Sequence, residues 1–228
     1  MGGMVSYASD GGTSEGYLAE PEAGAGPAVI VIQEWWGLVS HITALADRFA
    51  QAGFVALAPD LYHGAQTTEP DQARRLLMGL AMDRAARDVA GAADYLAAHP
   101  RSTGEKVGAV GFCMGGSLAL WSATLSQRIA VSVGFYPSIP WERMSPSWDN
   151  YAGRTAVLHC SEQDGTSAAP GIQAARTAIE ASGGKCVLYD YPGTRHAFFN
   201  DDRPEVYDAD AALSAWARTL DALRTHLG

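Results

Sequence analysis

The sequence predicts an α/β fold in which a mostly parallel sheet is covered by helices on both faces, with an antiparallel hairpin at its N-terminal edge. Short β-branched runs alternate with helix-period segments from about residue 27 onward. Most of these runs are continuously apolar, as strands buried on both faces are. With 228 residues and 47% hydrophobic side chains, the chain can bury one sizeable core, so we expect a single domain over residues 1–228.

The predicted strands follow from these apolar runs. Residues 4–8 and 16–18 flank Asp10-Gly11-Gly12, a turn sequence typical of an antiparallel hairpin. The strands of the parallel part are expected at residues 28–33, 54–58, 107–111, 131–136, 156–160 and 186–191.

Two helices are indicated between strands by apolar residues at helical spacing. The first covers residues 42–50, with Ser40 as its expected N-cap and Gly53 as its end. The second covers residues 89–97 and ends before Pro100. Both helices present one apolar face, as helices packed on a sheet do.

The C-terminal helix is expected to begin near Pro204. Its predicted apolar face consists of Leu213, Trp216, Leu220, Leu223 and Leu227. A stretch without clear periodicity, residues 137–154, precedes the strand at 156–160 and carries Trp141 and Trp148. A loop of this length in a compact domain tends to be functional.

The charge balance excludes several classes of partner. Against 16 Lys and Arg stand 25 Asp and Glu, so the net charge of -9 repels a phosphate backbone or an anionic membrane. No apolar run approaches the roughly 18 residues of a membrane span, and residues 1–20 lack the features of a signal peptide. We therefore expect a cytoplasmic protein without nucleic-acid or membrane partners.

The most specific local signal surrounds Cys113. Residues 107–116 read Val-Gly-Ala-Val-Gly-Phe-Cys-Met-Gly-Gly, an apolar strand that runs through Gly-x-Cys-x-Gly into a helix. This is the pattern of a nucleophile elbow with sulfur in place of oxygen, and small residues at Gly111 and Gly115 let strand and helix pass closely. The helix N-terminus favours a thiolate and offers the Met114 N–H to an oxyanion. The alternative is a buried structural cysteine.

The three cysteines form neither a CxxC pair nor an even framework, so neither a zinc ribbon nor a disulfide scaffold is indicated. Cys160 and Cys186 fall within predicted strands and are expected to be core residues. A redox protein that uses Cys113 would need one of them close by.

A nucleophile needs a base, and the base needs an orienting acid. On this type of fold the chain order is nucleophile, acid, histidine. Asp164 follows the strand at 156–160 and His196 follows the strand at 186–191, so both lie where open α/β sheets build their sites. We expect Asp164 to be the acid and His196 the base. Glu162 is an alternative acid, with Asp164 then serving the turn.

The first parallel strand ends in Gln33-Glu34-Trp35-Trp36-Gly37, where the second oxyanion donor of such sites usually originates. From the residues alone, Glu34 reads as an exposed loop acid. Trp35 and Trp36 read as the wall of a pocket.

Together these motifs resemble the dienelactone hydrolase family of the α/β-hydrolase fold, over nearly the whole chain. The resemblance rests on Gln33-Glu34 before an aromatic pair and Gly37, on Pro59-Asp60-Leu61-Tyr62, on residues 111–116, on Asp164 and on His196-Ala197-Phe198. It implies that Cys113, Asp164 and His196 form a catalytic triad. It also implies that Glu34 holds the resting thiol and takes part in its activation, and that the Trp35 and Met114 N–H groups bind the oxyanion.

The resemblance implies cysteine-dependent hydrolysis of a small-molecule ester or lactone through a thioester, by a monomer or homodimer without metal or organic cofactor. A catalytically silent ligand-binding protein of the same fold is the alternative. The expected pocket wall includes Trp36, Tyr62 and Phe198.

Family members that act on dienelactone bind its carboxylate with two arginines, and this sequence has Asn200 and Pro70 at those positions. Arg74 and Arg75, one turn further on, are candidate replacements, and Arg195 or Arg203 is near enough in sequence to reach the mouth. Solvent-exposed charge is the alternative reading of all four arginines.

Overall fold

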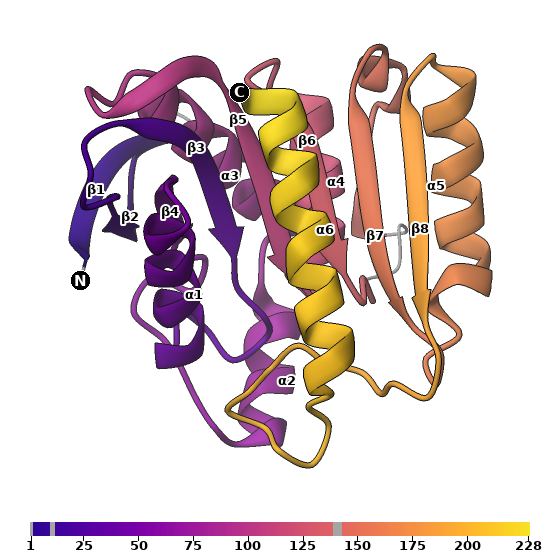
Figure 1. The fold of residues 1–228 in the computed structure, drawn as a ribbon. Helices are drawn as coiled ribbons and strands as arrows, with labels where there is room; N and C mark the ends of the chain where they lie inside the picture. The colour runs from indigo at the N-terminus through magenta and orange to yellow at the C-terminus, as the bar shows by residue number, and fades with distance from the viewer. Residues whose placement is uncertain (1, 10–11, 139–142) are drawn as a thin grey trace.

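The computed structural model describes residues 2–9, 12–138 and 143–228, and its strands join one sheet (Figure 1). The strands are β1 Gly3–Ser9, β2 Gly12–Ala19, β3 Gly26–Ile32, β4 Val55–Pro59, β5 Ser102–Phe112, β6 Ile129–Phe135, β7 Thr155–Ser161 and β8 Lys185–Tyr191. The helices are α1 Ser40–Gln51, α2 Pro70–Gly79, α3 Met82–Ala97, α4 Met114–Leu125, α5 Pro170–Ala181 and α6 Ala209–Leu227, with short 3-10 turns η2 Trp148–Tyr151 and η3 Thr166–Ala168. None of these described helices is both long and apolar enough to cross a bilayer.

The strand order is β1-β2-β4-β3-β5-β6-β7-β8, which confirms the predicted mostly parallel sheet with an antiparallel N-terminal edge. β1 pairs antiparallel with β2, and β2 pairs antiparallel with β4. Every later neighbour, from β4 across to β8, is parallel. The predicted hairpin turn at Asp10-Gly11 lies outside the described residues, which resume at Gly12 opposite Ser9.

Helices cover both faces of the sheet, with α1 and α6 on one face and α3, α4 and α5 on the other (Figure 1). Successive side chains of β3 enter the two resulting cores alternately. Ile30 and Ile32 belong to the core under α3 and α4, whereas Val29 and Val31 belong to the core under α1 and α6. A strand buried on both faces needs a continuous apolar run, which is why the sequence located β3.

The end of α1 is as predicted and its beginning is not. Gly53 adopts a φ of +96°, the left-handed conformation that ends a helix, and its N–H bonds to the Ala50 carbonyl at 3.0 Å. The N-cap, however, is Val39, and Ser40 is the first helical residue. The Val39 carbonyl accepts from the Ile42 and Thr43 N–H groups at 3.0 and 3.2 Å, so the preceding turn starts the helix without help from a side chain.

The C-terminal helix α6 begins five residues later than the predicted Pro204. Asp208 is its N-cap, and the carboxylate accepts from the Ala211 N–H at 2.9 Å. The predicted face is wrong at Leu213, which is 70% exposed. The buried residues are Ala212, Ala215, Thr219 and Leu223. Small residues let α6 lie close to the sheet, where Leu223 occupies the space that a Cβ at Gly108 would fill.

A few residues anchor the described part of the 137–154 stretch in the core. Tyr151 is fully buried, and its hydroxyl donates to the Leu120 carbonyl at 3.1 Å. The Arg154 guanidinium bonds to the Ala123 and Ser126 carbonyls near the C-terminus of α4. Trp148 packs on Tyr151, with ring centroids 5.9 Å apart, and Trp141 lies outside the described residues.

The backbone of β5 and the backbone of α4 are in direct contact where the strand turns into the helix. A Cβ on Gly111 would overlap the Gly115 carbonyl, and a Cβ on Gly115 would lie 2.5 Å from the Ile32 and Gln33 carbonyl oxygens. The prediction that both positions require small residues is therefore confirmed. This contact places Cys113 at the edge of the sheet where the loops after the parallel strands gather, the lower edge in Figure 1.

Replacing Gly111 by Ala is expected to destabilise the protein by about 3 kcal/mol, because the added methyl group overlaps backbone that cannot move without displacing α4. The matched control is Gly104→Ala in the same strand, where a Cβ meets nothing within 4 Å. Urea unfolding of both variants measures the difference. Equal stabilities of the two variants would contradict the close-approach argument.

Candidate active site

Cys113 occupies a strained turn between β5 and α4. Its φ of 55° and ψ of -119° are unusual for a residue with a side chain. The Cys113 N–H donates to the Phe135 carbonyl at 3.0 Å, and the Cys113 carbonyl accepts from the Gly116 N–H at 3.0 Å. These bonds hold the side chain at the N-terminus of α4, where the helix dipole favours an anion.

The other two cysteines have different surroundings. Cys113 is partly exposed, whereas Cys160 and Cys186 are buried, as predicted for core residues. Burial raises the pKa of the Cys160 thiol to about 12 and that of the Cys186 thiol to about 11. A buried thiol with a raised pKa is poorly reactive, so neither residue has the character of a resolving cysteine.

Asp164 and His196 are brought together as predicted. The His196 Nδ1 lies 2.7 Å from the Asp164 Oδ2, and the Ser161 hydroxyl donates to the same oxygen at 2.5 Å. The Glu162 carboxylate instead accepts from the Gly193 N–H at 2.7 Å. The alternative assignment is therefore wrong in its geometry, because Glu162 serves the turn and Asp164 faces the histidine.

The imidazole of His196 lies between Asp164 and Cys113. Burial disfavours its charged form, but hydrogen bonds to Asp164 and Cys113, together with their charges, outweigh burial and raise the pKa of His196 to about 10. Burial acts against ionisation of Asp164 too, yet hydrogen bonds from His196 and Ser161 lower the pKa of its carboxyl group. The arrangement therefore favours an imidazolium next to the cysteine.

Glu34 is buried, with 3% of its surface exposed, so the reading as an exposed loop acid is wrong. Its carboxylate accepts from the Asn200 side-chain amide at 3.1 Å and from the Tyr136 hydroxyl at 3.4 Å. Tyr136 connects this carboxylate to the other site residues, since its ring lies 4.9 Å from that of His196. Burial, then the charges of Glu34 and Cys113, raises the pKa of the Tyr136 hydroxyl well above its usual value.

Three contact residues of this site were not predicted from sequence. Tyr136 follows β6 directly, and its position after a parallel strand was a usable signal. Asn200 was noted only because it stands where family members that act on dienelactone have an arginine. Ser138, whose hydroxyl lies 3.2 Å from the Cys113 Sγ, belongs to a stretch without periodicity, so no pattern marked it.

The predicted oxyanion donors are placed at two neighbouring chain turns. Met114 is the first residue of α4, and Trp35 follows Glu34 after β3. Among the described residues, no acceptor is found for the N–H of either residue. The Trp35 and Trp36 rings are half-buried and meet edge to face, with centroids 5.0 Å apart. Backbone N–H groups without an acceptor in the described chain are suited to bind an oxyanion.

The two other expected pocket residues, Tyr62 and Phe198, differ in their exposure. Tyr62 lies beside the start of α4, because its hydroxyl donates to the Met114 Sδ at 3.6 Å. Burial and the charge of Cys113 raise the Tyr62 pKa. Phe198 is fully buried between the rings of Tyr136 and Tyr191, at 5.5 and 4.9 Å. The expectation that Phe198 lines the pocket is therefore wrong, since it has no surface to offer a substrate.

The predicted substrate-binding arginines lie on α2, and Arg75 lines a cavity of about 330 Å³ together with Tyr62. Arg74 and Arg75 are exposed on α2, and no contact of either with Cys113, His196 or Glu34 is found in the described part of the chain. Arg143 is engaged elsewhere, with the carbonyls of Leu77 and Leu80 at the end of α2. The field of Arg203 reaches the site and acts to lower the Tyr136 pKa.

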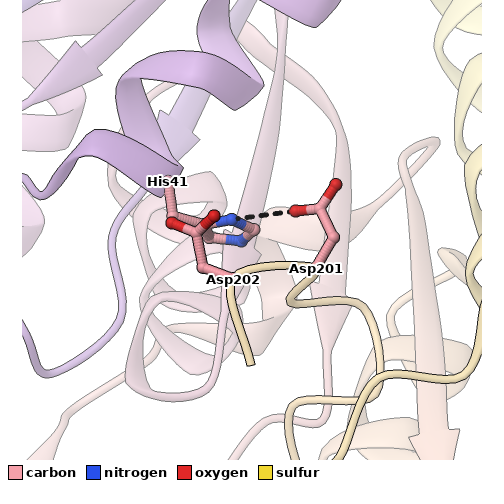
Figure 2. Close-up of side chains that lie close together, drawn as sticks. All are labelled: His41, Asp201 and Asp202. Atoms are coloured by element: carbon pink, nitrogen blue, oxygen red, sulfur yellow. Dashed lines mark ion pairs between the residues drawn. The ribbon is translucent and has the colours of Figure 1, made fainter. Parts of the chain in front are cut away.

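One cluster near the site offers a nitrogen and two carboxylates within 4.8 Å of one another: His41, Asp201 and Asp202 (Figure 2). The His41 Nδ1 lies 3.3 Å from one oxygen of Asp201, and the Arg48 guanidinium lies 3.5 Å from the other. Two groups on α1, His41 and Arg48, thus share Asp201. They hold the segment that carries Asn200 against α1.

Comparisons with known proteins agree with this architecture. The model of the dienelactone hydrolase family matches residues 14–227. Protein usf of Aquifex pyrophilus is 34% identical over 100% of both chains. A protein of Aquifex aeolicus with the provisional name carboxymethylenebutenolidase is 32% identical, also over 100% of both chains.

Solved structures give the same fold. A provisionally named dienelactone hydrolase from Klebsiella pneumoniae superposes with a TM-score of 0.82 at 24% identity, over 98% of each chain. A family match over almost the whole length thus accompanies an α/β-hydrolase fold. The chain belongs to the dienelactone hydrolase family and is a hydrolase of ester or lactone bonds.

Proposed function

We propose that this protein hydrolyses a small-molecule ester or lactone through a thioester on Cys113, with the whole chain acting as one domain. The observation that carries the proposal is the joint placement of three groups. A partly exposed thiol sits at a helix N-terminus, that cysteine helps to raise the pKa of an imidazole beside it, and a carboxylate lies 2.7 Å from the imidazole Nδ1. This is the set of roles that nucleophilic acyl transfer requires.

In the first half of the reaction, the Cys113 thiolate attacks the substrate carbonyl carbon and forms the C–S bond. The carbonyl electron pair moves to oxygen, and the oxyanion accepts hydrogen bonds from the Trp35 and Met114 N–H groups. Collapse of this intermediate expels the alkoxide or enolate, which takes a proton from His196. The product of this half is a thioester on Cys113 and the released alcohol.

In the second half, His196 is neutral and takes a proton from water, which attacks the thioester carbonyl. The C–S bond breaks, and the carboxylic acid leaves while Cys113 and His196 regain their starting state. Asp164 supports the imidazolium in both halves through its bond to Nδ1.

We assign Glu34 a role in activating the thiol when substrate binds. Two features support this assignment. The carboxylate is buried, and it shares Tyr136 as a neighbour with both Cys113 and His196. A buried carboxylate is costly to keep, so its contact with Tyr136, which neighbours Cys113 and His196, favours a role in the reaction.

Replacing Cys113 by Ala is expected to lower ester turnover by about a thousandfold or more, because no other described group can form the thioester. Intact-mass analysis after brief mixing with a p-nitrophenyl ester should show an acyl adduct on the wild type and none on the variant. Cys186→Ala is the matched control and should retain the adduct, since that thiol is buried. Full activity of a folded Cys113→Ala protein would remove Cys113 as the nucleophile.

The His196 imidazole is expected to titrate well above its ordinary value of 6.5, towards about 10. The charged form of His196 therefore makes its whole contribution to the stability of the folded state below pH 6.5. This contribution is lost as the pH rises towards 10. Asp164→Asn should lower the titration midpoint, because it removes the carboxylate that favours the charged ring.

Histidine ¹³C NMR measures this midpoint, with His196→Gln assigning the signal. Glu162→Gln is the control and should leave the midpoint near that of the wild type, because Glu162 bonds to Gly193 instead. A midpoint that moves with Glu162 and not with Asp164 would reverse the assignment of the acid.

Glu34→Gln is expected to lower kcat/KM by about tenfold or more and to change the unfolding temperature little, because glutamine keeps the shape of the side chain and removes its charge. Steady-state kinetics and thermal unfolding separate the two effects. Glu105→Gln, at an exposed ion pair with Arg128, is the control for loss of one negative charge. Wild-type kinetics in Glu34→Gln would reduce Glu34 to a structural group.

A further inference from the structure

A cavity of about 390 Å³ adjoins the candidate active site. Trp36 and Asn200 line it, and each is a neighbour of a site residue, one in the sequence and one through a hydrogen bond. Trp36 follows the proposed oxyanion donor Trp35, and the Asn200 amide binds the Glu34 carboxylate at 3.1 Å. The cavity therefore lies next to the residues that hold the Glu34 side of the site.

The charges around this cavity are unfavourable to an anion. Asp202 and Glu205 line it, and Arg203 is the one arginine among its described lining residues. The Arg203 guanidinium is already bound to Glu205, with Nε and one terminal nitrogen each 2.9 Å from Oε1. The cavity thus presents more negative than positive charge, with its arginine neutralised.

The buried wall behind the cavity adds to this field. Glu34 is held by an amide and a phenol, both uncharged donors, and no cation contacts its carboxylate among the described residues. His41 also lines the cavity, and its Nδ1 lies 3.3 Å from the Asp201 carboxylate. Among the described lining residues, a second carboxylate brought by a substrate would meet Asp202, Glu205 and an arginine that is already paired.

We propose that this cavity receives an uncharged part of the substrate and discriminates against esters and lactones that carry a carboxylate. The Arg203–Glu205 ion pair sets this preference by masking the cation that an anionic substrate would need. The proposal rests on the proposed function for its reaction and names the substrate class of the same site. It predicts that a change of one charge at Glu205 changes selectivity.

Glu205 is suited to such a test because its side chain is exposed and its ion pair contributes little to stability. The probes are p-nitrophenyl hexanoate, which is neutral, and mono-p-nitrophenyl adipate, which has the same acyl length and one carboxylate. The wild type is expected to prefer the hexanoate by about tenfold or more in kcat/KM.

Glu205→Gln should reduce this preference by about threefold, because it frees Arg203 for the adipate carboxylate. Arg203→Gln should change the preference in the opposite direction. Glu180→Gln, which removes the same charge from the exposed Arg176–Glu180 pair on α5, is the matched control and should leave the preference unchanged. A wild-type preference for the adipate, or equal preferences in the wild type and Glu205→Gln, would overturn the proposal.

A second measurement does not depend on turnover. Cys113 is the partly exposed cysteine of the three, so its alkylation by neutral iodoacetamide and anionic iodoacetate reports on the local charge. The effect of the His196 imidazolium is common to all variants and cancels in their comparison. The ratio of the iodoacetate rate to the iodoacetamide rate should rise in Glu205→Gln and stay constant in Glu180→Gln.

The two measurements separate the failure of either idea. If neither ester is hydrolysed while the alkylation ratio rises in Glu205→Gln, the proposed function falls and the charge preference stands. If hydrolysis depends on Cys113 but neither ratio responds to Glu205, the reaction stands and the charge preference falls.

Discussion

The contact between the backbone of β5 and the backbone of α4 is the constraint on which the site depends. Without side chains at Gly111 and Gly115, the strand and the helix meet directly, and the chain between them must turn within a few residues. Cys113 lies at that turn and adopts a left-handed conformation that costs about 1–3 kcal/mol. The surrounding sheet maintains this strain, and the strain aims the thiol at the edge where the histidine and acid loops end.

The electrostatics of the site follow from what each ionisable group is paired with. His196 is flanked by two groups that favour its charged form, so a cation sits between the thiol and Asp164. Glu34 is bound by neutral donors instead. The site therefore combines a stabilised positive charge at the base with a buried negative charge that has no cationic contact in the described chain. A charged substrate interacts with both His196 and Glu34, and the sign of its charge determines which of the two attracts it.

The sequence predicted the fold well because β3, β5, β6 and β7 need continuous apolar runs, and because glycines two residues before and two residues after Cys113 are typical of a nucleophile elbow. The positions of Asp164 and His196 followed from their places after strands. Ser138, Tyr136 and Asn200 act through tertiary contacts that no local pattern encodes. Phe198 was misplaced because the left-handed turn at Ala197, with a φ of 66°, directs its ring into the core. Leu213 was misplaced because the buried face of α6 follows Ala212, Ala215, Thr219 and Leu223, and Leu213 lies off this face.

The ion pairs of Asp201 with His41 and Arg48 close a ring of contacts around Glu34. From Glu34 the chain continues through Trp35 and Trp36 into α1. Side chains of α1 contact Asp201, and the preceding residue, Asn200, binds the Glu34 carboxylate. Part of this ring is exposed, since Asp201 is 49% accessible and Arg48 is 37% accessible. Dissolved salt screens exposed pairs far more than buried ones. The orientation of the buried Glu34 carboxylate is thus linked to the ionic strength of the solvent, because Asn200, which binds it, is adjacent to Asp201.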